Sequence, residues 1–382
     1  MLNRSTQRTI AAGRGGGRVM MNDASSLRNV LAAYCLEPSK WEVIPLGAGN
    51  INDTYLVQSR DNAFVLQKIN SGVFSDPLRV IGNFEKITTY LRLNKPSSEP
   101  GVRVASAVRT LAGCSHYVGE NGDFWRAQSY ISHSSKRVLN DAGEARQVGV
   151  ILAAFHSRLE DFDSSGLEEP LPGFHDLPLY LQAFDAVSRE ISREIGRDLR
   201  YCLQIVDKYR DRATTLTRAR QAGILRPQPV HGDPKLDNFL FNDRNECFGL
   251  LDLDTVSMGL IHHDLGDCLR SCCNRAGEDG GDNLQVIFDL QTCRALLEGY
   301  FSASRGMGEP QRHYIFDGVL LICFELGLRF LTDFLDGNHY FKVEQDDDNL
   351  FKAVNQFRLT VDVDQKENSI RNLVEDVASS FS

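Results

Sequence analysis

The feature that most constrains the fold is a change of hydrophobic periodicity after residue 131. Before it, from residue 41, apolar runs such as "WEVIPL", "TYLVQS" and "FVLQKIN" alternate with Gly-, Asn- and Asp-rich breaks. This alternation is typical of short strands joined by tight turns. One segment, residues 75–94, instead has apolar residues at helical spacing and Pro77 in its first turn. These residues therefore predict a small, mostly antiparallel sheet with one helix.

From residue 132 onward the periodicity is mainly helical, and residues 179–223 alone are expected to supply one or two helices. Two β runs interrupt this half: "VHGDPKLDNFLF" and "CFGLLDLDTV". A β-rich part followed by a larger helical part predicts an α+β fold with two lobes. We expect an N-terminal lobe over residues 24–131 and a helical C-terminal lobe over residues 132–382.

The N-terminal 23 residues are predicted to form a disordered extension. They contain four arginines, and no acidic residue precedes Asp23. They also lack the continuous apolar core of a secretory signal. The alternative is that translation starts at Met20 or Met21, so that the residues before it are not part of the native protein.

Composition excludes several classes of protein. The net charge of −9 argues against a nucleic-acid-binding surface, and no apolar run reaches the roughly 20 residues that cross a membrane. The nine cysteines form no CxxC pair, which favours reduced thiols in a cytoplasmic protein. Separately, we expect a monomer or a weak homodimer. Cysteines 268, 272 and 273 follow His262 and His263, but their spacing matches no zinc pattern.

The strongest chemical signal is a cluster of polar residues within the two β runs. His231, Gly232, Asp233 and Asn238 form H-G-D-x-x-x-x-N, and Asp252 follows in "LLDLDT". Phosphoryl transfer needs a carboxylate for the attacking hydroxyl and metal ions for the polyphosphate. An Asp and an Asn on one loop, with an Asp from the next strand, can supply this carboxylate and a magnesium site. The alternative is that these aspartates only form turns, but that reading leaves a carboxylate buried among apolar neighbours.

The motifs "HGDxxxxN", "LDxD" and "DLGD" resemble those of the aminoglycoside phosphotransferase and choline kinase superfamily, which has a protein-kinase-like fold. Within it, five segments resemble the N-acetylhexosamine 1-kinases: "GAGNINDTYLV", "FVLQKIN", "LLDLDTV", "HDLGDCLR" and "ELGLRFLTDFLDGNHYF". The resemblance extends over residues 30–370 or so. It implies a nucleotide-binding N-terminal lobe and a catalytic, substrate-binding C-terminal lobe.

The resemblance also implies roles for residues of the catalytic motifs. Asp233 would be the general base, and Asn238 and Asp252 would hold Mg²⁺. Asp264 would brace the catalytic loop, and Lys235 could approach the γ-phosphate of ATP. His231 and Asp267 would shape the site. Asp254 would either support the metal ligands or act as a structural partner.

The nucleotide site implied by the resemblance begins with the turn "GAGNIND". Its Gly49, Asn50 and Asn52 would lay backbone N–H groups over phosphate oxygens. Kinases place a lysine on the third strand, whereas alignment puts Gln67 there and Lys68 one residue later. Adjacent strand residues face opposite sides, so only one of the two can reach the nucleotide. The resemblance favours Gln67, because the N-acetylhexosamine 1-kinases also carry Gln at this position.

Three further residues complete that nucleotide site. Glu85 would be the helix carboxylate, and the hinge at residues 127–131, with Gln128 and Tyr130, would contact adenine.

Acceptor recognition is assigned to Arg329 and Tyr340, with Arg270 facing either phosphate or acceptor. Glu325, Arg329 and Asp333 are spaced four apart, so a buried ion ladder along one helix face is an equal alternative.

The resemblance implies an ATP- and Mg²⁺-dependent kinase acting on the anomeric hydroxyl of an N-acetylhexosamine. A kinase of the same fold for an amino alcohol, homoserine or an aminoglycoside is the first alternative. A non-catalytic nucleotide-binding protein is the second, because the strand lysine is missing.

Overall fold

The computed structural model describes residues 21–46, 51–94, 101–189, 195–277 and 285–381. The N-terminal lobe contains α1 (Met21–Tyr34), η1 (Pro38–Lys40), β1 (Glu42–Pro45), β2 (Asp53–Gln58), β3 (Ala63–Lys68), α2 (Pro77–Leu93), β4 (Ala107–Val108), β5 (Tyr117–Val118) and β6 (Phe124–Ser129). Its sheet has the order β1-β2-β3-β6-β4, with β5 also paired to β6, and every pairing is antiparallel. The predicted sheet with one helix is therefore confirmed. Of the predicted extension, residues 1–20 lie outside the described residues, and Met21 begins α1.

The C-terminal lobe is mainly helical. Its helices are α3 (Ala142–Leu159), η2 (Ser164–Gly166), α4 (Leu177–Ser188), α5 (Arg197–Tyr209), η3 (Arg210–Thr214), α6 (Thr215–Gln221), η4 (Leu236–Asn238), η5 (Leu253–Thr255), α7 (Ile261–Cys273), α8 (Leu290–Ala303), α9 (Glu309–Arg312), α10 (Ile315–Asp336), α11 (Asp348–Gln365) and α12 (Glu367–Ser379). Its short strands are β7 (Gln228–Val230), β8 (Phe239–Phe241), β9 (Cys247–Leu250) and β10 (Ser257–Gly259). The stretch at 179–223 forms parts of α4, α5 and α6, more helices than expected.

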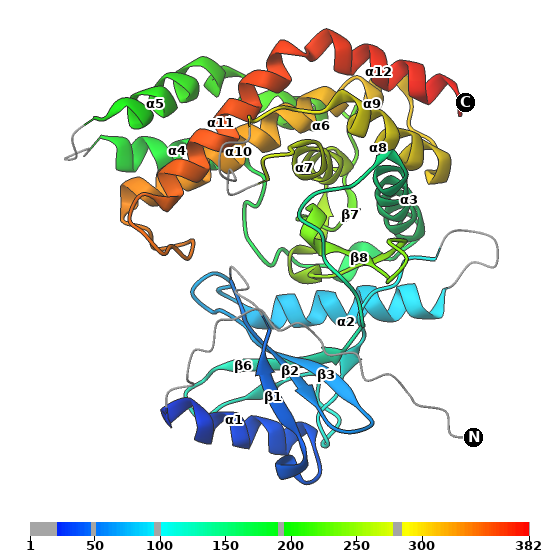
Figure 1. Ribbon diagram of the computed structural model, residues 1–382, viewed down its shortest axis with the longest axis vertical. Helices are drawn as coiled ribbons and strands as arrows, with labels where there is room; N and C mark the ends of the chain where they lie inside the picture. The colour runs from blue at the N-terminus through cyan, green and yellow to red at the C-terminus, as the bar shows by residue number, and fades with distance from the viewer. Residues whose placement is uncertain (1–20, 47–50, 95–100, 190–194, 278–284, 382) are drawn as a thin grey trace, which may run out of the picture.

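The two lobes meet at α2, which lies between the sheet and the helical lobe (Figure 1). Its apolar face, with Phe84, Ile87 and Leu91, belongs to the same continuous core as the C-terminal helices. Strands β7 to β9 lie on the side of the helical lobe that faces α2 (Figure 1). The loops that follow these strands are therefore presented toward the N-terminal lobe.

The helical lobe is assembled by unusually close helix crossings. A Cβ atom added to Gly149 of α3 would lie 2.0 Å from the carbonyl oxygen of Leu296 in α8. Gly318 of α10 similarly lies against the backbone of His262 in α7, at 2.4 Å from a built Cβ. The crossing at Gly318 fixes α7 against α10, and these two helices carry the acceptor-site candidates Arg270 and Arg329.

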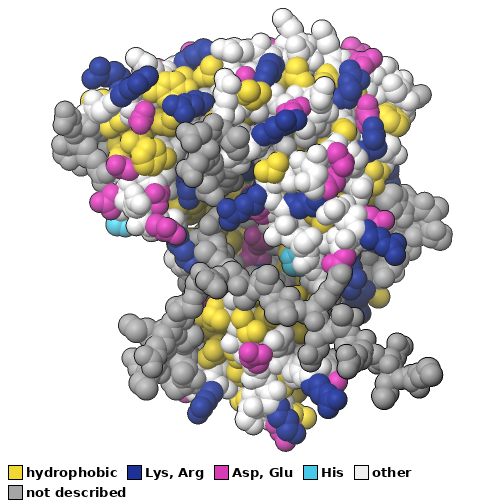
Figure 2. Space-filling model, viewed as in Figure 1, with side chains coloured by type: hydrophobic (Ala, Val, Ile, Leu, Met, Phe, Trp, Pro, Cys, Tyr) yellow, Lys and Arg dark blue, Asp and Glu magenta, His cyan; other side chains and the backbone are white. Residues whose placement is uncertain are grey.

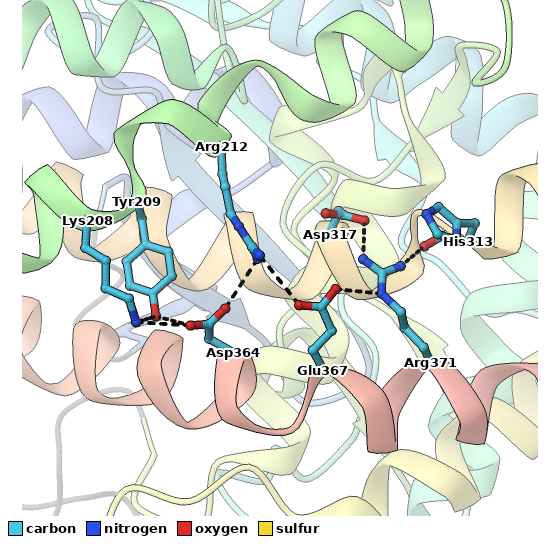
Figure 3. A network of polar contacts seen from close by, with 8 residues as sticks. All are labelled: Lys208, Tyr209, Arg212, His313, Asp317, Asp364, Glu367 and Arg371. Atoms are coloured by element: carbon cyan, nitrogen blue, oxygen red, sulfur yellow. Dashed lines mark hydrogen bonds and ion pairs between the residues drawn. The ribbon is translucent and has the colours of Figure 1, made fainter.

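A polar network ties the last two helices to the rest of the lobe (Figure 3). Asp364 at the end of α11 accepts hydrogen bonds from Tyr209 (2.7 Å) and Lys208 (3.1 Å). In α12, Arg371 bonds Asp317 of α10 at 3.1 Å and Glu367 at 2.8 Å. The junction between α11 and α12 is thus held by charges from α5 and α10.

None of the described helices is both long enough and apolar enough to cross a membrane. The nine cysteines are all free, and the described residues contain no cluster of three or more His, Cys, Asp or Glu side chains suited to a metal ion.

We expect Gly149→Ala to lower the free energy of unfolding by about 1–3 kcal/mol, because the new methyl group has no room against the α8 backbone. Gly82→Ala on α2 is the control, since a Cβ there meets nothing within 4 Å. It should stabilise the protein by about 0.4–1 kcal/mol. Urea unfolding of both variants measures this, and equal stabilities would contradict the close crossing.

Candidate active site

The loop between β7 and β8 carries the H-G-D motif, and Asp264 at the start of α7 holds its backbone. The two carboxylate oxygens of Asp264 accept hydrogen bonds from the amides of His231 (2.7 Å) and Gly232 (2.8 Å). His156 of α3 donates to the same carboxylate at 2.9 Å. Gly232 has a φ of +88°, and a Cβ there would lie 2.8 Å from the carbonyl of Thr255, so only glycine fits.

Asp233 follows directly and reaches into the space between the lobes. Its carboxylate lies 3.1 Å from the ammonium of Lys235. Burial opposes ionisation, but the charge of Lys235 outweighs it and lowers the pKa of Asp233. Asp233 is therefore a carboxylate at neutral pH, the form that can accept a proton.

Asn238 and Asp252, the predicted metal ligands, are brought together by the backbone. The amide of Leu251 donates to the carbonyl of Asn238 at 2.8 Å, which places Asp252 beside η4. The side-chain nitrogen of Asn238 donates to the carbonyl of Asp233 (2.7 Å), so its Oδ1 is the atom that can face a cation. Asp252 has a left-handed backbone (φ +58°), a strained conformation that non-glycine residues adopt mostly at functional sites.

The charges at Asp252 fit a divalent cation. Burial, then the neighbouring Asp254 and Asp233, raise the pKa of Asp252 to about 7. Carboxylates crowded in this way need a countercharge to ionise together. Mg²⁺ commonly takes only one or two protein ligands, with phosphate oxygens completing its shell. Asn238 and Asp252 are sufficient for that kind of site.

A cavity of about 520 Å³ between the lobes collects most of the predicted nucleotide residues. Acidic side chains are visible recessed between the lobes in Figure 2. The cavity is lined by the following predicted residues: Asn52, Gln67, Gln128, Tyr130, Asp233, Lys235, Asn238 and Asp252. Lys68 is on the other side of β3 and pairs with Asp123 at 2.9 Å, so Gln67 is the inward residue. Gly49 and Asn50 lie outside the described residues.

The placement of Glu85 at the nucleotide site is wrong. Its carboxylate pairs with Arg109, its side chain is partly exposed, and it is not among the residues that line the cavity. The polar residue that α2 buries toward the C-terminal lobe is Asn83, which donates to the carbonyl of Val256 at 2.8 Å. Because Glu85 pairs with Arg109 while Asn83 faces the C-terminal lobe, Glu85 is not the partner of Gln67.

Arg126 of β6, which the sequence analysis missed, is the partner of Gln67. Its Nε and Nη2 donate to Gln67 Oε1 at 3.1 and 2.8 Å, and it forms a buried ion pair with Asp254. Gln67 and Arg126 are directly opposite in the β3–β6 register, and Gln128 lies on the same face. Strand alternation in "WRAQS" could have revealed this polar face.

Asp254 is thereby assigned as a structural partner. One carboxylate oxygen accepts from Arg126 and the other from Asn52 at 2.6 Å. Asn52 in turn accepts from the amide of Asn70 at 2.9 Å. The side chain of Asn52, a residue predicted at the nucleotide site, therefore links the two lobes.

The predicted acceptor residues surround two adjoining cavities on the other side of Asp233. The smaller, about 90 Å³, is lined by Asp233, Arg270, Arg329 and Tyr340, and the larger, about 320 Å³, shares Arg329 and Tyr340 with it. Arg270 is buried and bonds Asp267 at 2.7 Å.

Arg329 does not belong to an ion ladder, so that alternative is wrong. Glu325 contacts His175 (2.9 Å), while Asp333 accepts from the backbone amides of Tyr340 and Phe341. The guanidinium of Arg329 instead lies 5.3–5.5 Å from the centres of four aromatic rings: Phe174, Tyr180, Tyr340 and Phe341. It also donates to the Tyr340 hydroxyl at 3.3 Å.

Comparison with known proteins agrees with this geometry. Residues 42–303, well over half of the chain, match the phosphotransferase enzyme family. The chain belongs to that family. It is accordingly an enzyme of the kinase type, and the family implies a nucleotide phosphoryl donor.

Solved structures show the same fold at low identity. An aminoglycoside phosphotransferase from Alicyclobacillus acidocaldarius has a TM-score of 0.61 at 13% identity, over 95% of this chain and 98% of its own. A choline kinase from Cryptosporidium parvum has 0.60 at 12%, over 94% and 99%. A microcompartment-associated aminopropanol kinase has 0.58 at 14%, over 91% and 98%. These likenesses establish the protein-kinase-like fold and leave the acceptor open.

We expect Arg126→Met to lower the free energy of unfolding by about 3–5 kcal/mol, because it leaves the Asp254 carboxylate buried without its partner. Arg109→Met removes a more exposed arginine–carboxylate pair, the one with the partly exposed Glu85, and should cost less than about 1 kcal/mol. Urea unfolding compares the two. Equal effects would show that the Arg126–Asp254 pair is not the stronger contact between the lobes.

Proposed function

We propose that this phosphotransferase transfers the γ-phosphoryl group of ATP to the anomeric hydroxyl of an N-acetylhexosamine. Asp233 acts as the general base, and Mg²⁺ binds Asn238 and Asp252. ATP occupies the 520 Å³ cavity between the lobes, and the acceptor occupies the cavities around Arg329.

The observation that carries the acceptor class is the position of Arg329 inside four aromatic rings. Rings arranged in this way attract alkylammonium ligands, but here the protein's own cation fills the space between them. An amine acceptor would meet a fixed like charge there. A neutral sugar gains donors from Arg329 and Tyr340 and aromatic faces for its ring.

The carboxylates of the pocket support the same choice. Glu325 is paired with His175, and Asp267 is paired with Arg270. The smaller cavity therefore has no excess of negative charge of the kind that an amino alcohol or aminoglycoside requires, whereas Asp333 and Asp336 line the larger cavity together with Arg329. Structural neighbours include choline and aminopropanol kinases.

In the proposed reaction the protein mainly positions the two substrates and neutralises the charge on the phosphates. Asp233 accepts the proton of the attacking hydroxyl, and its lowered pKa keeps it ionised until then. Bound Mg²⁺ would neutralise charge on the β- and γ-phosphates. Lys235, beside Asp233, supplies a further cation near the transferred group. Arg126 does not replace the missing strand lysine, because it is engaged with Gln67 and Asp254.

An acceptor panel tests the proposal. Purified protein with Mg-ATP should phosphorylate N-acetylglucosamine or N-acetylgalactosamine and leave choline, ethanolamine, homoserine and kanamycin essentially unchanged. Coupled ADP release measures turnover, and loss of the sugar's reducing end identifies the anomeric product. Turnover of an amine with none on either sugar would overturn the acceptor assignment.

Asp233→Asn should reduce turnover by about 10²–10⁴-fold while ATP affinity survives, because only the proton acceptor is lost. Asp243→Asn, in the turn between β8 and β9, is the control and should stay near the wild type, since Asp243 is exposed and does not line the cavity. Calorimetry with ATP and steady-state assays separate the two effects. A wild type that binds ATP but turns over no acceptor would instead favour the non-catalytic alternative.

A further inference from the structure

His175 lies at the end of the loop that leads into α4 and has a left-handed backbone conformation, which is uncommon for residues other than glycine. Its φ is +61°, in the left-handed region. Such a conformation costs on the order of 1 kcal/mol or more and persists only where surrounding contacts enforce it. The contacts that hold His175 are therefore informative.

Both ring nitrogens of His175 contact groups that can only accept hydrogen bonds. Nδ1 lies 2.9 Å from a carboxylate oxygen of Glu325, and Nε2 lies 2.8 Å from the carbonyl oxygen of Gly232. A neutral imidazole can donate from only one nitrogen, whereas the imidazolium donates from both. The geometry thus calls for a protonated His175 that donates to Glu325 and to the Gly232 carbonyl.

The neighbouring charges agree with this protonation state. Burial and the nearby Arg329 oppose a charge on the ring, but Glu325 and the Gly232 carbonyl outweigh them and raise the pKa of His175. The ring of His263 in α7 lies 4.9 Å away, and burial holds its pKa well below the usual value. His263 is therefore neutral and adds no repulsion.

The carbonyl that His175 holds belongs to the peptide immediately before Asp233. The amide of Gly232 is already held by Asp264 of α7. His175 holds the carbonyl of the same residue, Gly232. His175 belongs to the loop at 171–175, and Phe174 of this loop lines the acceptor cavities. Its partner Glu325 is one helical turn before Arg329 on α10.

We propose that His175 is a positioning residue that couples the acceptor pocket to the catalytic aspartate. As an imidazolium, it locks the Gly232–Asp233 peptide to α10 and to the acceptor loop. When it is neutral, one of the two hydrogen bonds is lost, and Asp233 is no longer held against the acceptor. The inference rests on the proposed role of Asp233 and not on the identity of the sugar.

The kinetic test uses His175→Ala and Glu325→Gln in the full-length protein. His175→Ala should lower kcat by roughly 10- to 100-fold, the scale of a small misplacement of a reacting group, with the KM for ATP little changed. Glu325→Gln keeps a hydrogen-bonding side chain but removes the charge, so the alkaline fall in kcat should move to lower pH. Asp317→Asn is the matched control: it removes another buried carboxylate of α10, one that pairs with Arg371, and should leave the pH profile unchanged.

A second measurement needs neither acceptor nor turnover. Imidazole NMR titration, assigned through His175→Gln, should show His175 protonated above pH 6.5 in the wild type and titrating at lower pH in Glu325→Gln. A ring that is neutral below its ordinary pKa, or a pH profile that Glu325→Gln leaves in place, would overturn the inference. If instead no N-acetylhexosamine is turned over while the NMR result holds, the acceptor assignment fails and the imidazolium brace stands.

Discussion

The buried ion pair between Arg126 and Asp254 is the contact on which the geometry of the nucleotide cavity depends. Both side chains are at most 4% exposed, so each charge has lost nearly all of its hydration. Such a pair needs further hydrogen bonds, and Gln67 and Asn52 supply three of them, although the buried Nη1 of Arg126 has no partner among the described residues. Asp254 also follows Asp252 by two residues. The contact that joins the lobes thus also fixes the strand end that carries a proposed metal ligand.

Helix α7 also positions the site, because its successive turns face different parts of it. Asp264 holds the backbone of the catalytic loop, and Asp267 holds Arg270 in the acceptor pocket. The helix can serve both only if its position against α10 is fixed. Backbone contact at Gly266 and Gly318 achieves this, since any larger side chain would separate the two helices.

Local patterns in the sequence were enough for the β-rich and helical parts and the H-G-D loop, whereas on β3 strand alternation left Gln67 and Lys68 as alternatives. These features depend on residues close together in the chain or on strand alternation. Glu85 was misplaced because a helix's periodicity gives its buried face but not which part of the other lobe that face meets. His175 left no local signal, since its partners Gly232 and Glu325 are 57 and 150 residues away.

The acceptor pocket shows why fold and acceptor class are separable. The amides of His231 and Gly232 in the phosphoryl-transfer loop are held by the side-chain carboxylate of Asp264 in α7, which is not part of the ring cluster. The rings around Arg329 come from two distant segments, the loop leading into α4 and the residues after α10. A cation placed among them by the protein removes the attraction that the same rings would offer an ammonium group. Arg329, a single side chain on α10, is therefore the main support for the proposed neutral acceptor.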